Sequence, residues 1–348
     1  MRAARTPFVT RQPRQVLITS ARESEGVTAE DDAAAIEALK TRDPHAVRRL
    51  VEAWTPAMLR IARLHVASPA AAEDAVQESW VIVLTAIERF EGRSSLRTYV
   101  LGIVVNVARR TGLAERRAIP FSSAWREERS DDRGPAVPPE RFDRVGGWIY
   151  PPQAWAASPD SVLSAVELRR AVESALDELP LRQRAVMTAR DVLGLSAGDV
   201  GGLYDVSEGN QRVLLHRARA KVRAAVEVYV AGDCDADSVA AGPIVRARSR
   251  RPAPPRRGQS IACHQLVELV DDYLEGRLQA DLRARVEQHL AGCEHCGEYV
   301  GQVRRVLDVT SSIADSAPRQ LVDRLCAALR GDHARPGSGA QASRRTVP

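Results

Sequence analysis

The stretch LDELPLRQRAVMTARDVLGLSAGDVGGLYDVSEGNQRVLLHRARAKVR, residues 176–223, contains the signals on which the predicted fold rests. Pro180 begins a helix that Gly194 ends, Ser196 caps a short helix, and Ser207 caps a longer one. A short helix, a tight turn and a longer helix are the order of a helix-turn-helix, whose last helix enters the DNA major groove. The segment therefore predicts a helical domain suited to duplex DNA.

The long helix is predicted to have one packing face and one cationic face. The packing face carries Gln211, Leu215, Ala218 and Val222. The cationic face carries Arg212, His216, Arg219 and Arg223, with Arg217 and Lys221 beside it. Cations at this spacing suit DNA phosphates, and the residues nearest the helix start would choose bases. The alternative is a solvated basic helix in a bundle.

A compact four-helix unit is predicted upstream, because apolar residues recur there at three- and four-residue spacing. A short helix over 30–40 precedes it. The predicted starts of its helices are Asp43, the pair Thr55-Pro56, the pair Ser68-Pro69, and Ser94 or Ser95.

Composition and charge exclude several classes of protein. The chain has 348 residues, which suggests two or three modules rather than one large core. Only 4% of the residues are aromatic, too few for a strand-rich sandwich, so an all-α fold is favoured. A run of about 18 apolar residues and a secretory signal are both lacking, which predicts a cytoplasmic protein. The net charge of +5 does not by itself identify a nucleic-acid binder.

Three of the five cysteines gather beside histidines towards the C-terminus. Cys263, His289, Cys293 and Cys296 form the pattern C-x25-H-x3-C-x2-C. Two closely spaced thiolates can hold one edge of a tetrahedral ion, and a histidine at the preceding helix end can approach it. We expect a closed structural zinc site that supplies much of the folding free energy of this small block. The alternative is scattered buried cysteines and an exposed histidine.

The composition along the chain predicts seven segments, because the linkers lose apolar periodicity and gain proline. They are an N-terminal extension (1–40), a helical domain (41–111), a proline-rich linker (112–160), the helix-turn-helix domain (161–230), an arginine- and proline-rich linker (231–260), the zinc-binding domain (261–310), and a helix with a disordered tail (311–348).

Enzyme motifs do not find the context that they need. Residues 194–198 fit the nucleophile pattern G-x-S-x-G, but that motif requires a preceding strand, and the segment before Ser196 is predicted to be a helix. Ser196 is explained instead as the N-cap of the short helix that follows it. The Cys/His cluster offers four ligands without H-E-x-x-H, so it does not predict a zinc hydrolase.

Residues 43–110 and 176–223 resemble the extracytoplasmic-function (ECF) branch of the bacterial RNA polymerase sigma factors. The first range carries DPHAVRRLVEAW, EDAVQESWVIVL and FEGRSSLRTYVLGIVVNVARR, and the second is the helix-turn-helix quoted above. Residues 147–155, GWIYPPQAW, resemble the linker of some members. The resemblance implies two helical sigma domains, regions 2 and 4, joined by a flexible linker.

The resemblance also implies roles for individual residues. Those expected to dock on the clamp helices of polymerase are Asp74, Gln77, Glu78 and Trp80. Those expected at the minus ten element are Arg93, Ser94, Arg97, Tyr99, Asn106, Arg109 and Arg110. Those expected at the minus thirty-five element are Ser207, Asn210, Arg212, His216, Arg217, Arg219 and Lys221. For Trp80 and Tyr99 the alternative is ordinary core packing. The sequence departs from the family pattern at Tyr99, Gly201, Gly202 and Gln211.

Residues 263–300, CHQLVELVDDYLEGRLQADLRARVEQHLAGCEHCGEYV, resemble the zinc-binding anti-sigma domain, normally a separate protein that holds a sigma factor inactive. We therefore expect a non-enzymatic initiation factor that binds core RNA polymerase and promoter DNA, with a fused zinc module that contacts its own sigma domains. The alternatives are a helix-turn-helix regulator that acts without polymerase, and a zinc-dependent interaction protein.

Overall fold

The structure is a computed structural model that describes residues 29–115, 135–155, 165–230, 260–313 and 317–329. Within these ranges all regular structure is helical, apart from one isolated antiparallel bridge between Phe142 and Trp148. The all-α prediction is therefore confirmed. None of the helices in these ranges combines the length and the apolar character needed to cross a membrane. The arginines of the predicted linker 231–260 and the tail beyond residue 329 lie outside the described residues.

The N-terminal bundle consists of α1 (Ala29–Thr41), α2 (Pro44–Arg63), α3 (Pro69–Ala86) and α4 (Leu96–Glu115). A short 3₁₀ turn, η1 (Ile87–Arg89), follows α3. The side chains of Asp43, Ser68 and Ser95 each accept a backbone N–H of the helix that follows, as the sequence predicts. Aliphatic side chains and two tryptophans fill the space between the helices.

The predicted helix start at Thr55-Pro56 is wrong, because α2 runs through both residues as one helix. Proline has no N–H to bond the carbonyl one turn earlier, so it normally ends or bends a helix. Here Val51 and Met58, on either side of the proline, are both fully buried in one core. Packing of this shared apolar stripe outweighs the lost hydrogen bond.

The helix-turn-helix is present as predicted, preceded by α6 (Ala165–Asp177). It consists of α7 (Leu181–Met187) with its π-helical continuation η4 (Thr188–Val192), then α8 (Ala197–Tyr204) and α9 (Glu208–Val230). Gly194 ends the first helical segment with φ +68°, a conformation that favours glycine. The Ser196 hydroxyl accepts the backbone N–H of Asp199 at 3.1 Å, so this serine is a helix cap.

Gln211 on α9 forms hydrogen bonds with α8 and with the turn between the two helices. The residue is only 2% exposed, and its Nε2 atom donates to the carbonyl oxygens of Ala197 and Val206, both at 2.9 Å. A Cβ on Gly201 would lie 3.4 Å from the Val206 carbonyl oxygen and 3.6 Å from Gln211 Nε2, which is ordinary van der Waals contact. Two departures from the family pattern are therefore neighbours in the structure.

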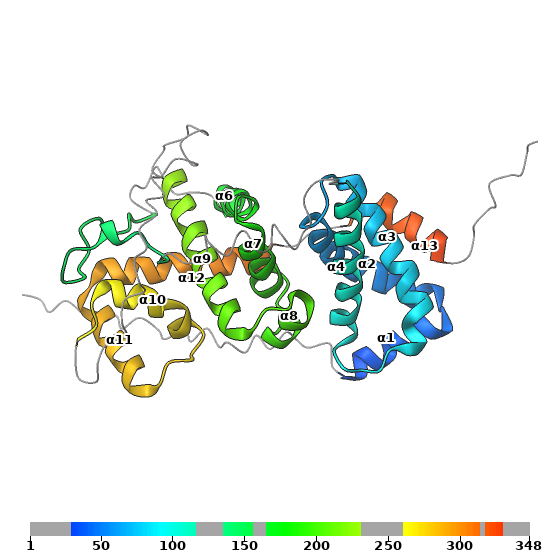
Figure 1. The fold of residues 1–348 in the computed structure, drawn as a ribbon, viewed down its shortest axis with the longest axis horizontal. Coiled ribbons are helices and arrows are strands. Elements are labelled where there is room, and N and C mark those ends of the chain that lie inside the picture. Colours follow the sequence, from blue (N-terminus) through cyan, green and yellow to red (C-terminus); the bar gives the residue numbers. More distant parts are fainter. Residues whose placement is uncertain (1–28, 116–134, 156–164, 231–259, 314–316, 330–348) are drawn as a thin grey trace, which may run out of the picture.

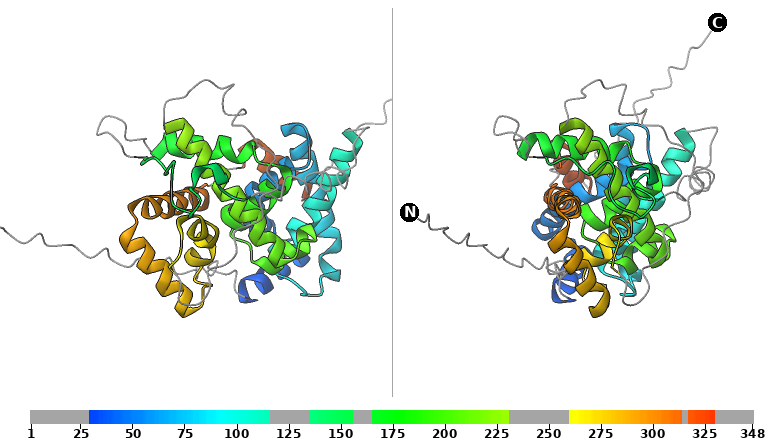
Figure 2. Two further views of the ribbon diagram at one scale, coloured as in Figure 1. Left: turned by 60° about the vertical axis from the view of Figure 1, so that its left-hand side comes forward. Right: turned by 90° about the vertical axis from the view of Figure 1, so that its left-hand side faces the viewer.

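The C-terminal helices are α10 (Cys263–Leu274), α11 (Ala280–Gly292), α12 (Glu294–Ser312) and α13 (Arg319–Leu329). Helices α10–α12 lie on the opposite side of α6–α9 from α1–α4 (Figures 1 and 2). Helix α12 packs across α6 and α9, α8 packs against α4, and α13 returns to α2 and α3. The C-terminal segment therefore contacts both helical bodies that precede it.

Candidate nucleic-acid interface and metal centre

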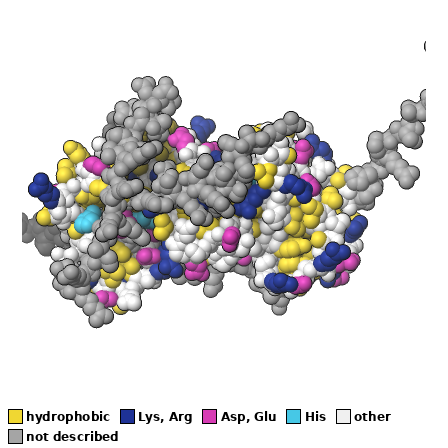
Figure 3. All heavy atoms as spheres, viewed as in Figure 1, with side chains coloured by type: hydrophobic (Ala, Val, Ile, Leu, Met, Phe, Trp, Pro, Cys, Tyr) yellow, Lys and Arg dark blue, Asp and Glu magenta, His cyan; other side chains and the backbone are white. Residues whose placement is uncertain are grey.

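The residues of α9 that the sequence assigns to DNA lie in different environments. Ser207, Arg212 and Lys221 are exposed, and Asn210 and Arg217 are half-buried. His216 and Arg219 are only 7% and 4% exposed, because α10 lies against this part of the helix. Among the described side chains visible in Figure 3, positive and negative charges are interspersed.

Arg219 is the centre of a buried ionic cluster at the junction of α9, η4 and α10. Its Nη2 and Nε atoms donate to the two carboxylate oxygens of Asp191 at 2.8 and 2.9 Å. Its Nη1 atom donates to Asp271 and Glu275, both at 2.8 Å. Burial would lower the pKa of Arg219, but Asp191 and Asp271 raise it above its ordinary value. The guanidinium is therefore a fixed cation held by two other segments.

His216, like Arg219, contacts α10. Its Nδ1 atom is 2.7 Å from the Asp271 carboxylate, and its Nε2 atom is 3.7 Å from that of Glu268. Burial would lower the pKa of His216, but the hydrogen bond with Asp271 and the nearby Glu268 raise it to about 9. Burial would raise the pKa of Asp271, but Arg219 and His216 hold it below its ordinary value. His216 is therefore cationic at neutral pH.

In this arrangement His216 and Arg219 do not face solvent, since acidic residues of α10 and its C-terminal end cover both; their contact with DNA stays a prediction. Sequence reasoning missed these acids. Glu268, Asp271, Asp272 and Glu275 recur at three- and four-residue intervals, which places them on one side of a helix. That spacing, complementary to the cations of α9, was the available signal.

In the N-terminal bundle, the residues expected at the minus ten element lie on α4 and the loop before it. Arg93, Ser94, Asn106 and Arg110 are exposed, whereas Arg97, Tyr99 and Arg109 are half-buried. Tyr99 packs against Phe90 with ring centroids 4.9 Å apart. The Arg109 guanidinium lies 5.7 Å from the ring centre of Tyr204 on α8. This part of α4 is therefore in contact with the helix-turn-helix.

Among the residues expected to dock on polymerase, Asp74 and Glu78 are exposed and Gln77 is half-buried. Trp80 is fully buried and stacks on Trp54, with ring centroids 6.3 Å apart. Its indole N–H donates to the Thr55 hydroxyl at 3.3 Å. A direct polymerase contact by Trp80 is therefore wrong for this structure, and the core-packing alternative describes it.

Helix α13 covers the surface beside these residues. Its Leu321 and Leu325 side chains are buried against the bundle. Arg324 pairs with Glu73 on α3 at 2.6 Å, and Asp323 pairs with Arg48 on α2 at 3.0 Å. Glu73 lies one helical turn before Gln77, so α13 borders the predicted polymerase-facing side of α3.

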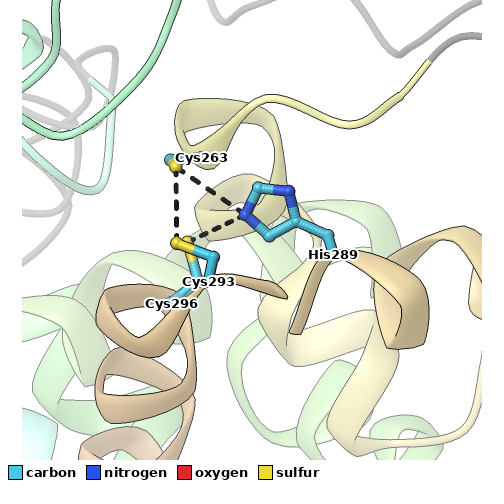
Figure 4. A group of neighbouring side chains, drawn as sticks. All are labelled: Cys263, His289, Cys293 and Cys296. Atoms are coloured by element: carbon cyan, nitrogen blue, oxygen red, sulfur yellow. Dashed lines mark hydrogen bonds between the residues drawn. The ribbon is translucent and has the colours of Figure 1, made fainter. Parts of the chain in front are cut away.

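Cys263, His289, Cys293 and Cys296 converge from α10, the end of α11 and the start of α12 (Figure 4). Their ligand atoms all lie within 4.8 Å of one another. The Cys263 sulfur is 3.7 Å from His289 Nε2 and 3.9 Å from the Cys293 sulfur. In a tetrahedral site with metal–sulfur bonds of about 2.3 Å, neighbouring sulfurs are about 3.8 Å apart. The predicted four residues therefore form a group that could hold a metal ion.

The pKa of Cys263 also favours a cation at the centre of the Cys/His cluster. The hydrogen bond with Cys296 lowers the pKa of Cys263 to about 5, against the opposing effect of burial. A thiolate is the form that binds a metal, and a dication at the centre would satisfy all three sulfurs together.

Three family models match the chain in the order of these structural units. The model described as "Sigma-70 region 2" matches residues 50–117, and "Sigma-70, region 4" matches residues 169–222. A model described as "Putative zinc-finger" matches residues 263–297. The matches fall on the N-terminal bundle, the helix-turn-helix and the Cys/His cluster.

Relatives of the chain carry the same assignment. The ECF RNA polymerase sigma factor SigG of Mycobacterium tuberculosis is 35% identical over 156 residues, 44% of this chain and 41% of that protein. ECF RNA polymerase sigma-E factors of Salmonella typhimurium and Escherichia coli K12 are 26% identical over 191 residues, 55% of this chain and 86% of theirs. The chain is thus similar to ECF sigma factors over parts of its length and matches both sigma-70 regions. It spans about two-fifths of the length of SigG, and most of α9 lies within the segment that matches sigma-70 region 4.

The raised pKa of His216 predicts that the contact between α9 and α10 depends on pH. Because folding raises this pKa, the stabilisation is fully present below about pH 6.5 and is lost as the pH rises through about 9. We expect amide hydrogen exchange in α10, corrected for its intrinsic pH dependence, to increase over this interval in the native chain. The increase should be much smaller in His216→Gln.

The matched control is His45→Gln, which replaces an exposed histidine at the start of α2. It should retain the pH dependence of the native chain. An identical pH dependence in His216→Gln and the native chain would contradict the assignment of the effect to His216.

Proposed function

We propose that the chain is a sigma factor of the ECF type that directs transcription initiation and carries its own zinc-dependent inhibitory module. It would act by binding core RNA polymerase and promoter DNA, without catalysis. One observation carries the proposal: the C-terminal helices engage both sigma regions. Helix α10 lies on the recognition helix, and α13 lies on α2 and α3.

Promoter recognition would be divided between the two regions. In region 2, exposed Arg93, Asn106 and Arg110 could bind the opened minus ten strand, where arginine stacks on or hydrogen-bonds to extruded bases. In region 4, exposed Ser207 and Arg212 stand at the start of α9, the end that enters the major groove. These residues keep the roles that the family resemblance implies.

Inhibition of DNA binding follows from the electrostatics of α9. Duplex DNA is bound largely by cations that displace counterions from its phosphates. In this arrangement Arg219 and His216 are already paired with carboxylates of α10. The acidic α10 would also repel the phosphates. Binding of the minus thirty-five element by this side of α9 therefore requires α10 to move away.

Helix α13 supports inhibition at the second region. Its ion pair with Glu73 places it beside the exposed acids of α3 that the family uses for polymerase. A clamp helix approaching Asp74 and Glu78 would meet α13 at the border of the same surface. We propose that polymerase and α13 compete for region 2.

Zinc is the ion that we propose for the Cys/His cluster. Three thiolates and one imidazole are the donors of structural zinc sites, whereas calcium and magnesium prefer oxygen. Four protein ligands leave no open coordination position, so the ion would stabilise the fold rather than catalyse a reaction. It would link α10, α11 and α12, whose shared core is small.

The zinc assignment predicts one equivalent of zinc in the purified full-length chain, measured by inductively coupled plasma mass spectrometry. Cys293→Ser should lose most of this zinc, because a hydroxyl is a poor replacement for a thiolate ligand. Cys326→Ala is the matched control, since Cys326 is buried in α13 outside the cluster. Equal zinc in the two variants would contradict the assignment.

Run-off transcription with reconstituted core polymerase tests the function. Templates are selected by the holoenzyme from a randomised promoter library. We expect the double variant Asp271→Asn, Glu275→Gln to give at least about tenfold more transcript than the native chain. Removing partners from a buried ion cluster destabilises it by roughly 3–5 kcal/mol, and about 1.4 kcal/mol already shifts an equilibrium tenfold. Asp281→Asn, at an exposed carboxylate of α11, is the control and should behave as the native chain.

The outcomes separate the two parts of the proposal. Transcription that is equal in the double variant and the native chain would contradict inhibition by α10. Promoter binding without any core-dependent transcript would contradict the sigma function and favour a helix-turn-helix regulator that acts alone.

A further inference from the structure

Residues 135–155, here called the strap, belong to the segment between regions 2 and 4 that the sequence reads as a flexible linker. In the structure the strap is packed on the zinc-finger domain. Val137 is buried in the core of that domain, and Phe142 and Trp148 pack against the same core. The rings of Phe142 and Trp148 have centroids 4.4 Å apart, and Trp148 lies 6.0 Å from Tyr299 on α12.

Gly146 is the point of closest approach between the strap and α10. Its carbonyl accepts the backbone N–H of His264 at 3.1 Å, and its φ is +88°. A Cβ at this position would lie 1.9 Å from His264 Nδ1. Only glycine fits both the backbone conformation and the contact.

Trp148 reaches the metal centre itself. Its indole Nε1 donates to the sulfur of Cys296 at 3.2 Å, and Cys296 is fully buried. Donors to a ligand atom orient the ligand and tune its affinity for the metal, and their loss typically weakens metal binding about 10–100-fold. Trp148 is therefore placed as a positioning residue for this ligand.

The other end of the same contact leads to the recognition helix. The Arg141 guanidinium lies 5.5 Å from the ring centre of Trp148, and its two terminal nitrogens pair with Glu227 on α9 at 3.0 and 3.2 Å. Glu227 also accepts the backbone N–H of Gln153 at 2.8 Å and pairs with Arg223 at 2.9 Å. An unbroken series of contacts thus joins the Cys296 sulfur to α9.

We propose that the strap couples the metal centre to the recognition helix, with Trp148 as the residue that responds to the metal-bound state of Cys296 and Arg141 as the link to α9. The inference rests on the proposed zinc site and sigma function. With zinc bound at Cys296, the indole N–H of Trp148 would hold this ligand in its position. Without the ion, the three segments that carry its ligands are no longer held together, and the strap loses its packing surface.

Release of the strap has a consequence for both regions. Glu227 loses two of its partners, so the C-terminal half of α9 loses support. Because the strap lies between region 2 and region 4 in the chain, its release also removes a folded segment from the connection between them. Metal loss would thereby loosen region 4 and allow the two regions to separate.

The test compares Trp148→Phe with Trp155→Phe in the full-length chain. Both remove an indole N–H from the strap, but Trp155 Nε1 has no hydrogen-bond partner among the described residues. We expect Trp148→Phe to release zinc to a chromogenic chelator at least about tenfold faster than the native chain, and Trp155→Phe to match the native chain. With Co²⁺ in place of zinc, the sulfur-to-cobalt charge-transfer band should move to longer wavelength only in Trp148→Phe.

Hydrogen exchange tests the second half of the coupling. Stripping zinc from the native chain should increase exchange in the strap and in the C-terminal half of α9 together. Gly146→Ala, which displaces the strap while keeping Trp148, should accelerate zinc release as well and serves if Trp148→Phe does not fold.

Equal zinc release from the two tryptophan variants, or an unchanged strap after zinc removal, would overturn the inference. None of these measurements uses polymerase or DNA, so their failure is distinct from failure of the proposed sigma function.

Discussion

The guanidinium of Arg219 is enclosed by carboxylates from two other segments: Asp191 on η4, and Asp271 on α10 with Glu275 at the C-terminal end of that helix. Taking such charges out of water is unfavourable unless each is paired with good geometry, and removing one partner strands the rest. A contact of this kind is therefore specific and close to all-or-none. DNA phosphates would bind the same cations, so DNA could compete with these carboxylates for Arg219 and His216. An apolar interface would not be open to such competition.

Contacts of α8, α13 and the strap join the other parts of the molecule. Region 4 lies between the zinc-finger helices and region 2. Its α9 packs against α12 on one side, and its α8 packs against α4 on the other. Helix α13 then closes on region 2 through Leu321, Leu325 and two ion pairs. The strap fills the angle between α9 and α12 through Arg141 and Trp148. In this arrangement the C-terminal helices contact both helical bodies that precede them, as the proposed inhibition within one chain requires.

Local signals predicted much of this structure, and tertiary context accounts for the errors. Asp43, Ser68 and Ser196 cap helices because capping depends on neighbouring backbone groups alone. The spacing of Cys263, His289, Cys293 and Cys296 predicts that they come together, because metal geometry imposes a recognisable spacing on its ligands. Pro56 was misread because packing on both sides of it keeps α2 intact.

Local sequence signals do not identify the tertiary partners of residues that are predicted to be exposed. A cationic helix face predicts an anionic partner but does not say which one, so the acids of α10 were missed as partners of His216 and Arg219. The proline-rich composition around Trp148 predicts a linker, and it gives no sign that this segment packs on another domain.

We propose that α10 covers α9 in the free chain and leaves it when promoter DNA binds. Pulsed electron paramagnetic resonance between spin-labelled unnatural residues at the exposed positions Glu208 and Asp281 tests this most directly. We expect one narrow distance in the free chain and a longer, broad distribution in the promoter complex with core polymerase. A broad distribution in the free chain, or the same narrow distance in the complex, would contradict it.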